Sequence, residues 1–227
     1  MRVVAGQWRG RPLMAPSGRA TRPTSDKVRE AMFDVLAALP EADAARRHDV
    51  DPGQLSGHVV LDLFAGSGGL GIEALSRGAA RCTFVERDRA ALRALHGNLE
   101  RLGIGVAAAD RRSRTLPPDQ EPRVRVLGVD VRRALSADAL RGSRYTLLFV
   151  DPPYERYLGL QPSLLRLLGP LLAQGAVIVI ETAVRTIVDL PWKVVREKRY
   201  GDTKIAFLVA DDLRDAQGAA DDDGEPI

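Results

Sequence analysis

Apolar residues in the middle of the chain gather in short runs with helical patterns between them. The runs that predict buried strands cover residues 58–64, 81–85, 124–129, 145–150 and 176–180. The intervening segments carry apolar side chains at helical spacing, as in the leucines at 92, 95, 99 and 102 and again at 160, 164, 167 and 168. Strands that alternate with helices predict an α/β domain with a parallel sheet. Two later strands, at 193–199 and 204–209, flank a tight turn and indicate an antiparallel pair at the sheet's end.

The N-terminal part has its own pattern. Residues 1–14 predict a short hairpin with Trp8 at its tip, and a helix entry follows at 22–26, where Thr24 or Ser25 is the expected cap. The apolar positions of this helix, Val28, Met32, Val35, Leu36 and Leu39, recur on one face that should pack on the domain. We therefore expect a basic N-terminal extension over 1–40, a main domain over 58–210, and exposed connections at 41–57 and 105–122.

The single cysteine of the 227 residues, Cys82, excludes an intramolecular disulfide and a zinc site built from several cysteines. The first residues lack the apolar core of a signal peptide, and no apolar run approaches the length of a membrane span. These features predict a cytoplasmic protein that needs neither a membrane nor a metal.

Charge is distributed unevenly along the chain. The net charge is +3, but residues 211–227 contain seven acids and one arginine, which leaves +9 for residues 1–210. This acidic tail has too little apolar surface to order itself. The first thirty residues hold seven Lys or Arg against two acids. A polyanionic partner fits this asymmetry, although charge alone does not exclude an ordinary solvated basic surface.

A glycine loop follows the first strand of the main domain. Gly66, Gly68 and Gly71 satisfy the G-x-G-x-x-G pattern, and Glu86 lies twenty residues beyond Gly66, as in a dinucleotide-binding dehydrogenase. Asp62, inside the preceding strand, favours a different cofactor. A carboxylate there repels pyrophosphate but can orient water or the amino group of S-adenosylmethionine.

The cofactor site is expected at the ends of the first three strands. Glu86 can accept both ribose hydroxyls and Asp130 the adenine amine, while the alternative for each acid is a helix cap or a surface carboxylate. The residues predicted to bind S-adenosyl-L-methionine are Asp62, Phe64, Ala65, Gly66, Ser67, Gly68, Glu86, Arg87, Asp130 and Val131.

The candidate chemistry lies directly after the fourth strand, at Asp151-Pro152-Pro153-Tyr154. Two prolines fix the direction in which the chain leaves the sheet. Asp151 and the Pro152 carbonyl can accept hydrogen bonds from an exocyclic amine, while Tyr154 stacks on the ring that carries it. A proline-stiffened turn without chemistry is the alternative.

The basic residues of the first segment are candidate RNA contacts. Arg2, Arg9, Arg11 and Arg22 can neutralise phosphates, and Trp8 can stack on a base. The alternative for Trp8 is a side chain that packs the hairpin onto the domain.

Together these strings resemble class I methyltransferases that modify exocyclic amines, and within them the RsmD family. The narrower match is carried by residues 2–11, by 22–30 with Phe33, and by 62–68 continuing through 73–78. The resemblance implies a Rossmann-like, mostly parallel seven-stranded sheet, S-adenosyl-L-methionine as cofactor, and methylation of a guanine N2 in 16S ribosomal RNA, within the small subunit or a late precursor. It covers residues 1 to about 209, and it is loose at 41–57 and 105–122.

Three other functions stay open at the level of sequence. An adenine N6 or protein glutamine methyltransferase would share both motifs, although the basic N-terminal segment counts against a protein substrate. A dehydrogenase would bind NAD, and a noncatalytic RNA-binding module would keep the basic segment but tolerate loss of Asp151.

Overall fold

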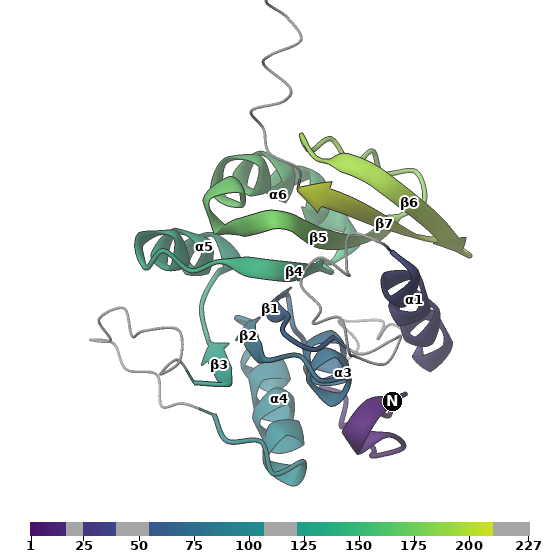
Figure 1. Cartoon of the computed structure of the whole chain (residues 1–227), viewed down its shortest axis with the longest axis vertical. Coiled ribbons are helices and arrows are strands. Elements are labelled where there is room, and N and C mark those ends of the chain that lie inside the picture. Colours follow the sequence, from purple (N-terminus) through teal and green to yellow (C-terminus); the bar gives the residue numbers. More distant parts are fainter. Residues whose placement is uncertain (17–24, 40–54, 107–121, 211–227) are drawn as a thin grey trace, which may run out of the picture.

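The structure, a computed structural model, describes residues 1–16, 25–39, 55–106 and 122–210. A seven-stranded sheet lies in the middle, with helices on both faces (Figure 1). Its strand order is β3-β2-β1-β4-β5-β7-β6. The first five strands pair in parallel, and β7 pairs antiparallel with β5 and β6. The predicted class I methyltransferase architecture, with its antiparallel closing pair, is confirmed.

The elements agree with most of the predicted runs. The strands are β1 (Val59–Leu63), β2 (Arg81–Val85), β3 (Val124–Leu127), β4 (Tyr145–Val150), β5 (Leu172–Ala183), β6 (Lys193–Tyr200) and β7 (Thr203–Ala210). The helices are α1 (Asp26–Ala38), α3 (Gly69–Ser76), α4 (Arg89–Arg101), α5 (Val131–Leu140) and α6 (Tyr154–Leu167), with 3-10 turns η1 (Gly6–Trp8) and η2 (Gly169–Leu171). Within the described ranges, no helix has the length and apolar character to cross a bilayer.

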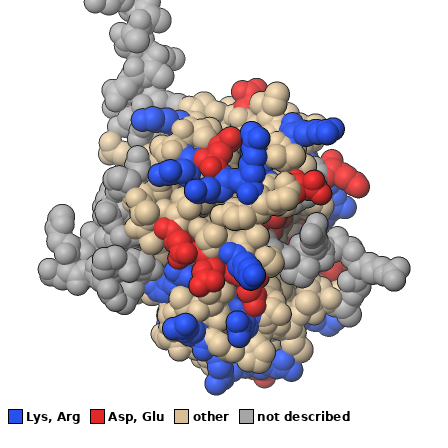
Figure 2. Space-filling model, turned by 90° about the vertical axis from the view of Figure 1, so that its right-hand side faces the viewer, with Lys and Arg blue, Asp and Glu red and all other residues tan. Residues whose placement is uncertain are grey.

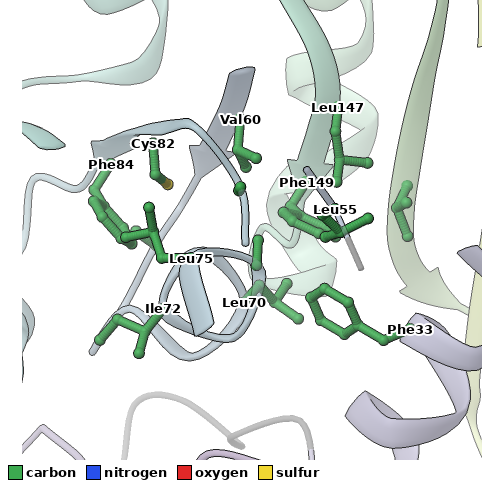
Figure 3. Packing of buried hydrophobic residues seen from close by; sticks show 14 of the residues in the cluster. Phe33, Leu55, Val60, Leu70, Ile72, Leu75, Cys82, Phe84, Leu147 and Phe149 are labelled. Atoms are coloured by element: carbon green, nitrogen blue, oxygen red, sulfur yellow. The ribbon is translucent and has the colours of Figure 1, made fainter. Parts of the chain in front are cut away.

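The two faces of the sheet carry separate hydrophobic cores. The first core packs α1, α3, α4 and the N-terminal residues Val3 and Leu13 on one face, and the second packs α5 and α6 on the other. In the first core, Phe33 of α1 points toward Leu70 and Phe149 (Figure 3), and the Phe33 and Phe149 ring centroids are 5.5 Å apart. Because α1, Val3 and Leu13 belong to this core, the N-terminal extension packs directly against the main domain.

Cys82 fills the first core. Burial raises the pKa of its thiol well above the ordinary value, and the nearby Asp62 carboxylate adds to the rise. A buried thiol of this kind is an inert packing group.

The N-terminal segment forms a short hairpin, as predicted. Its two sides pair at Arg2 and Pro12 and are joined by three backbone hydrogen bonds, and η1 occupies the tip. Ser25 caps α1 by accepting a hydrogen bond from the Val28 N–H, as predicted. The last residue of this helix is Ala38.

A buried carboxylate fastens this segment to the domain. Glu73 of α3 is fully buried, and its oxygens accept the Val4 and Ala5 N–H groups at 2.7 and 2.9 Å. The same carboxylate pairs with Arg77 at 2.9 Å and lies 3.7 Å from the buried Arg29 of α1. One side chain therefore joins the N-terminal segment, α1 and α3.

Glu73→Ala is expected to cost about 3 to 5 kcal/mol of unfolding free energy, because it leaves the buried Arg77 guanidinium and two backbone N–H groups without this partner, while Arg29 keeps its ion pair with Asp26. Urea denaturation measures the loss. Glu100→Ala, on the exposed surface of α4, is the matched control and should change stability by less than about 0.5 kcal/mol. A loss below about 1 kcal/mol for Glu73→Ala would contradict the role given to this carboxylate.

Candidate active site

The predicted site residues lie along one edge of the sheet. β1, β2, β3 and β4 are parallel, so their carboxyl ends lie at the same edge. The strand order reverses between β1 and β4, which is where ligands bind in open α/β sheets. Leu63 and Val150 are register partners, so the glycine loop and the Asp151 loop leave the sheet at the same level. We refer to this edge as the catalytic edge.

The glycine loop turns sharply at its start. Phe64 has φ +64°, an uncommon conformation for a residue other than glycine, and is partly exposed. Gly68 has φ +87°, and a Cβ there would lie 2.5 Å from Leu95. A Cβ on Gly71 would lie 2.3 Å from the Phe84 ring. Around Gly66, in contrast, the nearest atom to an added Cβ is 4.0 Å away, so a ligand has room to approach this backbone.

Asp62 is buried beneath the loop. Its Oδ2 accepts a hydrogen bond from the Gly71 N–H at 2.9 Å, which anchors the first turn of α3. Burial raises the pKa of Asp62 to about 7, the Gly71 hydrogen bond opposes this rise, and the Glu86 charge adds to it. The acid singled out by the sequence therefore supports the loop from below.

Glu86 holds the loop from its other side. Oε2 accepts the Gly66 N–H at 3.0 Å, and Oε1 accepts the Arg87 and Asp88 N–H groups at 2.7 and 2.8 Å. The side chain is partly exposed at the end of β2. Two carboxylate oxygens offer about four acceptor positions, so these three bonds leave capacity for a ligand hydroxyl.

Asp130 is a helix cap, which was the alternative considered for it. Its Oδ1 accepts the Arg132 N–H at 3.0 Å at the start of α5, and Oδ2 lies 3.3 Å from Nη1 of Arg87. Val131, the first residue of α5, is buried. The sheet thus places Asp130 and Val131 beside Arg87, at the end of the strand next to Glu86.

The Asp151 loop is short and leads directly into α6. Asp151 is half-buried, Pro152 is buried, and Pro153 precedes the helix as its cap residue. Tyr154 is the first residue of α6 rather than part of a longer loop. The backbone N–H of Asp151 points to the Leu63 carbonyl at 3.5 Å, next to the start of the glycine loop.

Comparison with known proteins decides the family. The family model described as "Conserved hypothetical protein 95" matches residues 1–209. "Ribosomal RNA small subunit methyltransferase D" of Escherichia coli strain K12 is 36% identical over 228 residues, covering 98% of this chain and 94% of that relative. The chain belongs to the RsmD family.

Solved structures agree with this membership. The structure named "Putative methyltransferase yhhF from Escherichia coli" has a TM-score of 0.69 at 33% identity and covers 93% of this chain and 98% of its own. A distant structure named as a methyltransferase "complexed with SAH" has a TM-score of 0.57 at 13% identity, covers 84% of this chain and 50% of its own, and shares the fold alone. Membership of the RsmD family removes the dehydrogenase alternative.

The predicted RNA contacts lie on a different part of this RsmD-family protein. Arg2, Arg9 and Arg11 are exposed, although Arg2 is 3.7 Å from Asp26 and Arg11 donates to the Arg101 carbonyl. Arg22 lies outside the described residues.

The contacts of Trp8 match the packing alternative. Trp8 is half-buried and packs against the first core, its backbone N–H donates to the Ser76 hydroxyl at 3.0 Å, and the Arg123 guanidinium lies 5.9 Å from its ring centroid. Ser76 ends α3 and Arg123 precedes β3, so the hairpin tip lies at the sheet edge opposite the catalytic edge.

Two site residues were missed at the sequence level. Asn98 of α4 is fully buried and donates to the Ser67 carbonyl in the glycine loop at 3.0 Å, while it exchanges two hydrogen bonds with the Met14 backbone. Arg29 is buried with Nη1 near Gly69, and it also donates to the Arg2 carbonyl. Helical spacing was the available signal, because each polar residue occupies an apolar stripe.

Asp62 provides a test by pH. Its folded-state pKa of about 7 lies above the ordinary 3.8, so the folded protein holds this proton more tightly than the unfolded chain. The resulting stabilisation is complete below about pH 4 and is lost as the pH rises through about 7.

Urea unfolding should therefore show that the unfolding free energy of the wild type is about 2 to 3 kcal/mol lower at pH 8 than at pH 5. Asp62→Asn should not show this loss. The asparagine keeps an acceptor for the Gly71 N–H but does not titrate. Identical pH dependence in the two proteins would mean that Asp62 is ionised in the folded state at both pH values.

Proposed function

We propose that this protein transfers a methyl group from S-adenosyl-L-methionine to the exocyclic N2 of a guanine in small-subunit (16S) ribosomal RNA. The observation that carries the proposal is the Asp151-Pro152-Pro153-Tyr154 loop, which lies beside the glycine loop at the strand-order reversal of an RsmD-family chain. The relatives named as ribosomal RNA methyltransferases support the substrate class, and such a substrate fits an activity in the cytoplasm.

Several features fit the cofactor. The open space at Gly66 admits close approach to the backbone, and Glu86 at the end of β2 keeps acceptor capacity for ribose hydroxyls. Asp62, Phe64, Ala65, Ser67 and Gly68 would line the methionine side, and Arg87, Asp130 and Val131 the adenine side. When bound, the cofactor supplies an electrophilic methyl group.

The Asp151 loop would activate the acceptor nitrogen. The lone pair of a guanine amine is shared with its ring, so the nitrogen is a poor nucleophile until its two hydrogens are held. Asp151 and the Pro152 carbonyl would accept those hydrogens and turn the lone pair toward the methyl group, while Tyr154 stacks on a base flipped from its helix. A carboxylate is too weak a base to deprotonate an arylamine, so the proton leaves after transfer.

The exposed arginines of the N-terminal segment would add phosphate contacts. Arg2, Arg9 and Arg11 are solvent-accessible, and Arg22 belongs to the same basic stretch of the sequence. Trp8 would contribute by fixing the direction of the hairpin that carries Arg9 and Arg11.

Glu86→Ala should weaken binding of S-adenosyl-L-methionine by about 1.5 to 3 kcal/mol, the range for a hydrogen bond to a charged group. Isothermal calorimetry measures the affinity, and Glu30→Ala, on the exposed face of α1, is the control. An affinity equal to the wild-type value would remove Glu86 from the cofactor site.

Asp151→Ala should bind the cofactor nearly as the wild type does, but should lose methyl transfer on the order of 100-fold, because its acceptor acts as charge develops on the amine. Labelled methyl transfer to small subunits from cells lacking this gene measures the rate, and nucleoside mass spectrometry identifies the product. Asp151→Asn should retain part of the activity. Wild-type turnover in Asp151→Ala would refute the amine-orienting role, and N6-methyladenosine as product would replace guanine by adenine.

A further inference from the structure

The last strand of the sheet, β6, is an edge strand with many exposed cations. It pairs only with β7, and six of its eight residues are exposed, while Val195 and Tyr200 are partly buried. Its exposed cations are Lys193, Arg196, Lys198 and Arg199. In the described part of the chain, none of these four side chains forms a hydrogen bond or an ion pair.

The strand register shows which way three of these side chains point. Lys193, Arg196 and Lys198 pair with Val209, Phe207 and Ile205 of β7, and all three β7 residues belong to the first core. Directly paired residues of an antiparallel ladder project on the same side. The three cations therefore project from the edge strand on the face of the sheet that α1 covers.

The acids of the β6–β7 hairpin do not neutralise this row of three cations. Glu197 pairs with Ala206, a residue of the second core, so it projects on the opposite face, where it lies 3.4 Å from Lys204. Asp202 lies in the turn after Tyr200. Figure 2, which views the molecule from the right-hand side of Figure 1, shows several blue side chains over its upper part with red ones between them, at the height of β6 in Figure 1.

One end of this row lies toward the catalytic edge. Tyr200 pairs with Thr203, and Thr203 pairs with Ala183 at the end of β5. Since β5 is parallel to β4, this end of β6 lies at the catalytic edge, three strand spacings from β4, or ~14 Å. Lys198 and Arg196 continue from there along the strand, about 6.7 Å apart on one face.

We propose that Lys193, Arg196 and Lys198 form a docking surface for the phosphate backbone of the substrate RNA, which runs along β6 from Lys198, near the catalytic edge, to Lys193, toward the opposite end of the sheet. The surface rests on the proposed function and specifies how the RNA lies across the domain. It supplies phosphate contacts, which set register and affinity but carry no sequence information. A charged edge strand also discourages edge-to-edge association of sheets, and the test separates that role from RNA docking.

The test compares Arg196→Gln/Lys198→Gln with the wild type for binding to purified small ribosomal subunits across a salt series. Losing two phosphate contacts should lower the slope of log affinity against log salt by about 1.5 and weaken binding on the order of tenfold near 0.1 M salt. The matched control is Arg133→Gln/Arg166→Gln, which removes the same charge from exposed positions on α5 and α6, in the layer on the opposite face. Cofactor affinity by calorimetry should be equal in all three proteins.

A reduced slope in the β6 variant alone, with cofactor affinity retained, supports the docking surface. Equal slopes in the β6 variant and the wild type overturn it, as does an equal reduction in the control. Arg196→Glu/Lys198→Glu provides a second reading, since repulsion should weaken RNA binding further, whereas an edge-protection role predicts unchanged affinity. If the wild type methylates subunits but the salt slopes of the wild type and the β6 variant are equal, the docking surface alone is overturned. If the wild type neither binds nor methylates subunits, the proposed function and the docking surface are both overturned.

Discussion

The buried carboxylate of Glu73 is the constraint on which the arrangement of the N-terminal half depends. An ionised group at full burial is tolerated only when hydrogen bonds and opposite charges surround it, and here they come from Val4, Ala5, Arg77 and Arg29. Each donor belongs to the N-terminal segment, to α3 or to α1. The segment is therefore held at a fixed place over α3, and removing it would leave the carboxylate short of two donors. Point variants separate RNA contacts from folding more cleanly than truncation does.

The same construction recurs at the glycine loop, where side chains from three different elements hold the backbone. Asp62 of β1 holds Gly71, Glu86 at the end of β2 holds Gly66, and Asn98 of α4 holds the Ser67 carbonyl. A loop fixed from three sides needs little further ordering when a ligand arrives, which lowers the entropic cost of binding. Because Asn98 also binds Met14, and Arg29 lies near Gly69, the N-terminal segment contributes to this ordering from two directions.

The sequence predicted the sheet well because strands in the middle of a parallel sheet are nearly continuous apolar runs between glycine, proline or charged residues. β2 and β4 begin and end where their apolar runs do. Prediction was weaker where packing rather than pattern sets the boundary. α6 begins six residues before Leu160, with Tyr157 buried on its core face, and Pro162 inside the helix conceals that periodicity. β5 likewise begins at Leu172, four residues before its apolar run, because its pairing with β4 extends to Tyr145 across an irregular register.

The residue types of the candidate site were predictable from the sequence, but the role of each residue was not. Spacing identified Asp62, Glu86 and Asp130, but only the hydrogen bonds of the structure show that Asp62 supports α3 from β1 and that Asp130 caps α5 locally. In the same way, strand register determines which basic residues lie near the candidate site. The basic N-terminal residues were the evident RNA contacts in the sequence, but the hairpin tip lies at the opposite edge from Asp151, whereas the cations of β6 extend to the catalytic edge. An RNA strand that reaches Asp151 and also contacts Arg9 must therefore span the whole width of the domain, while one that contacts Lys198 need extend only three strands from the reacting base.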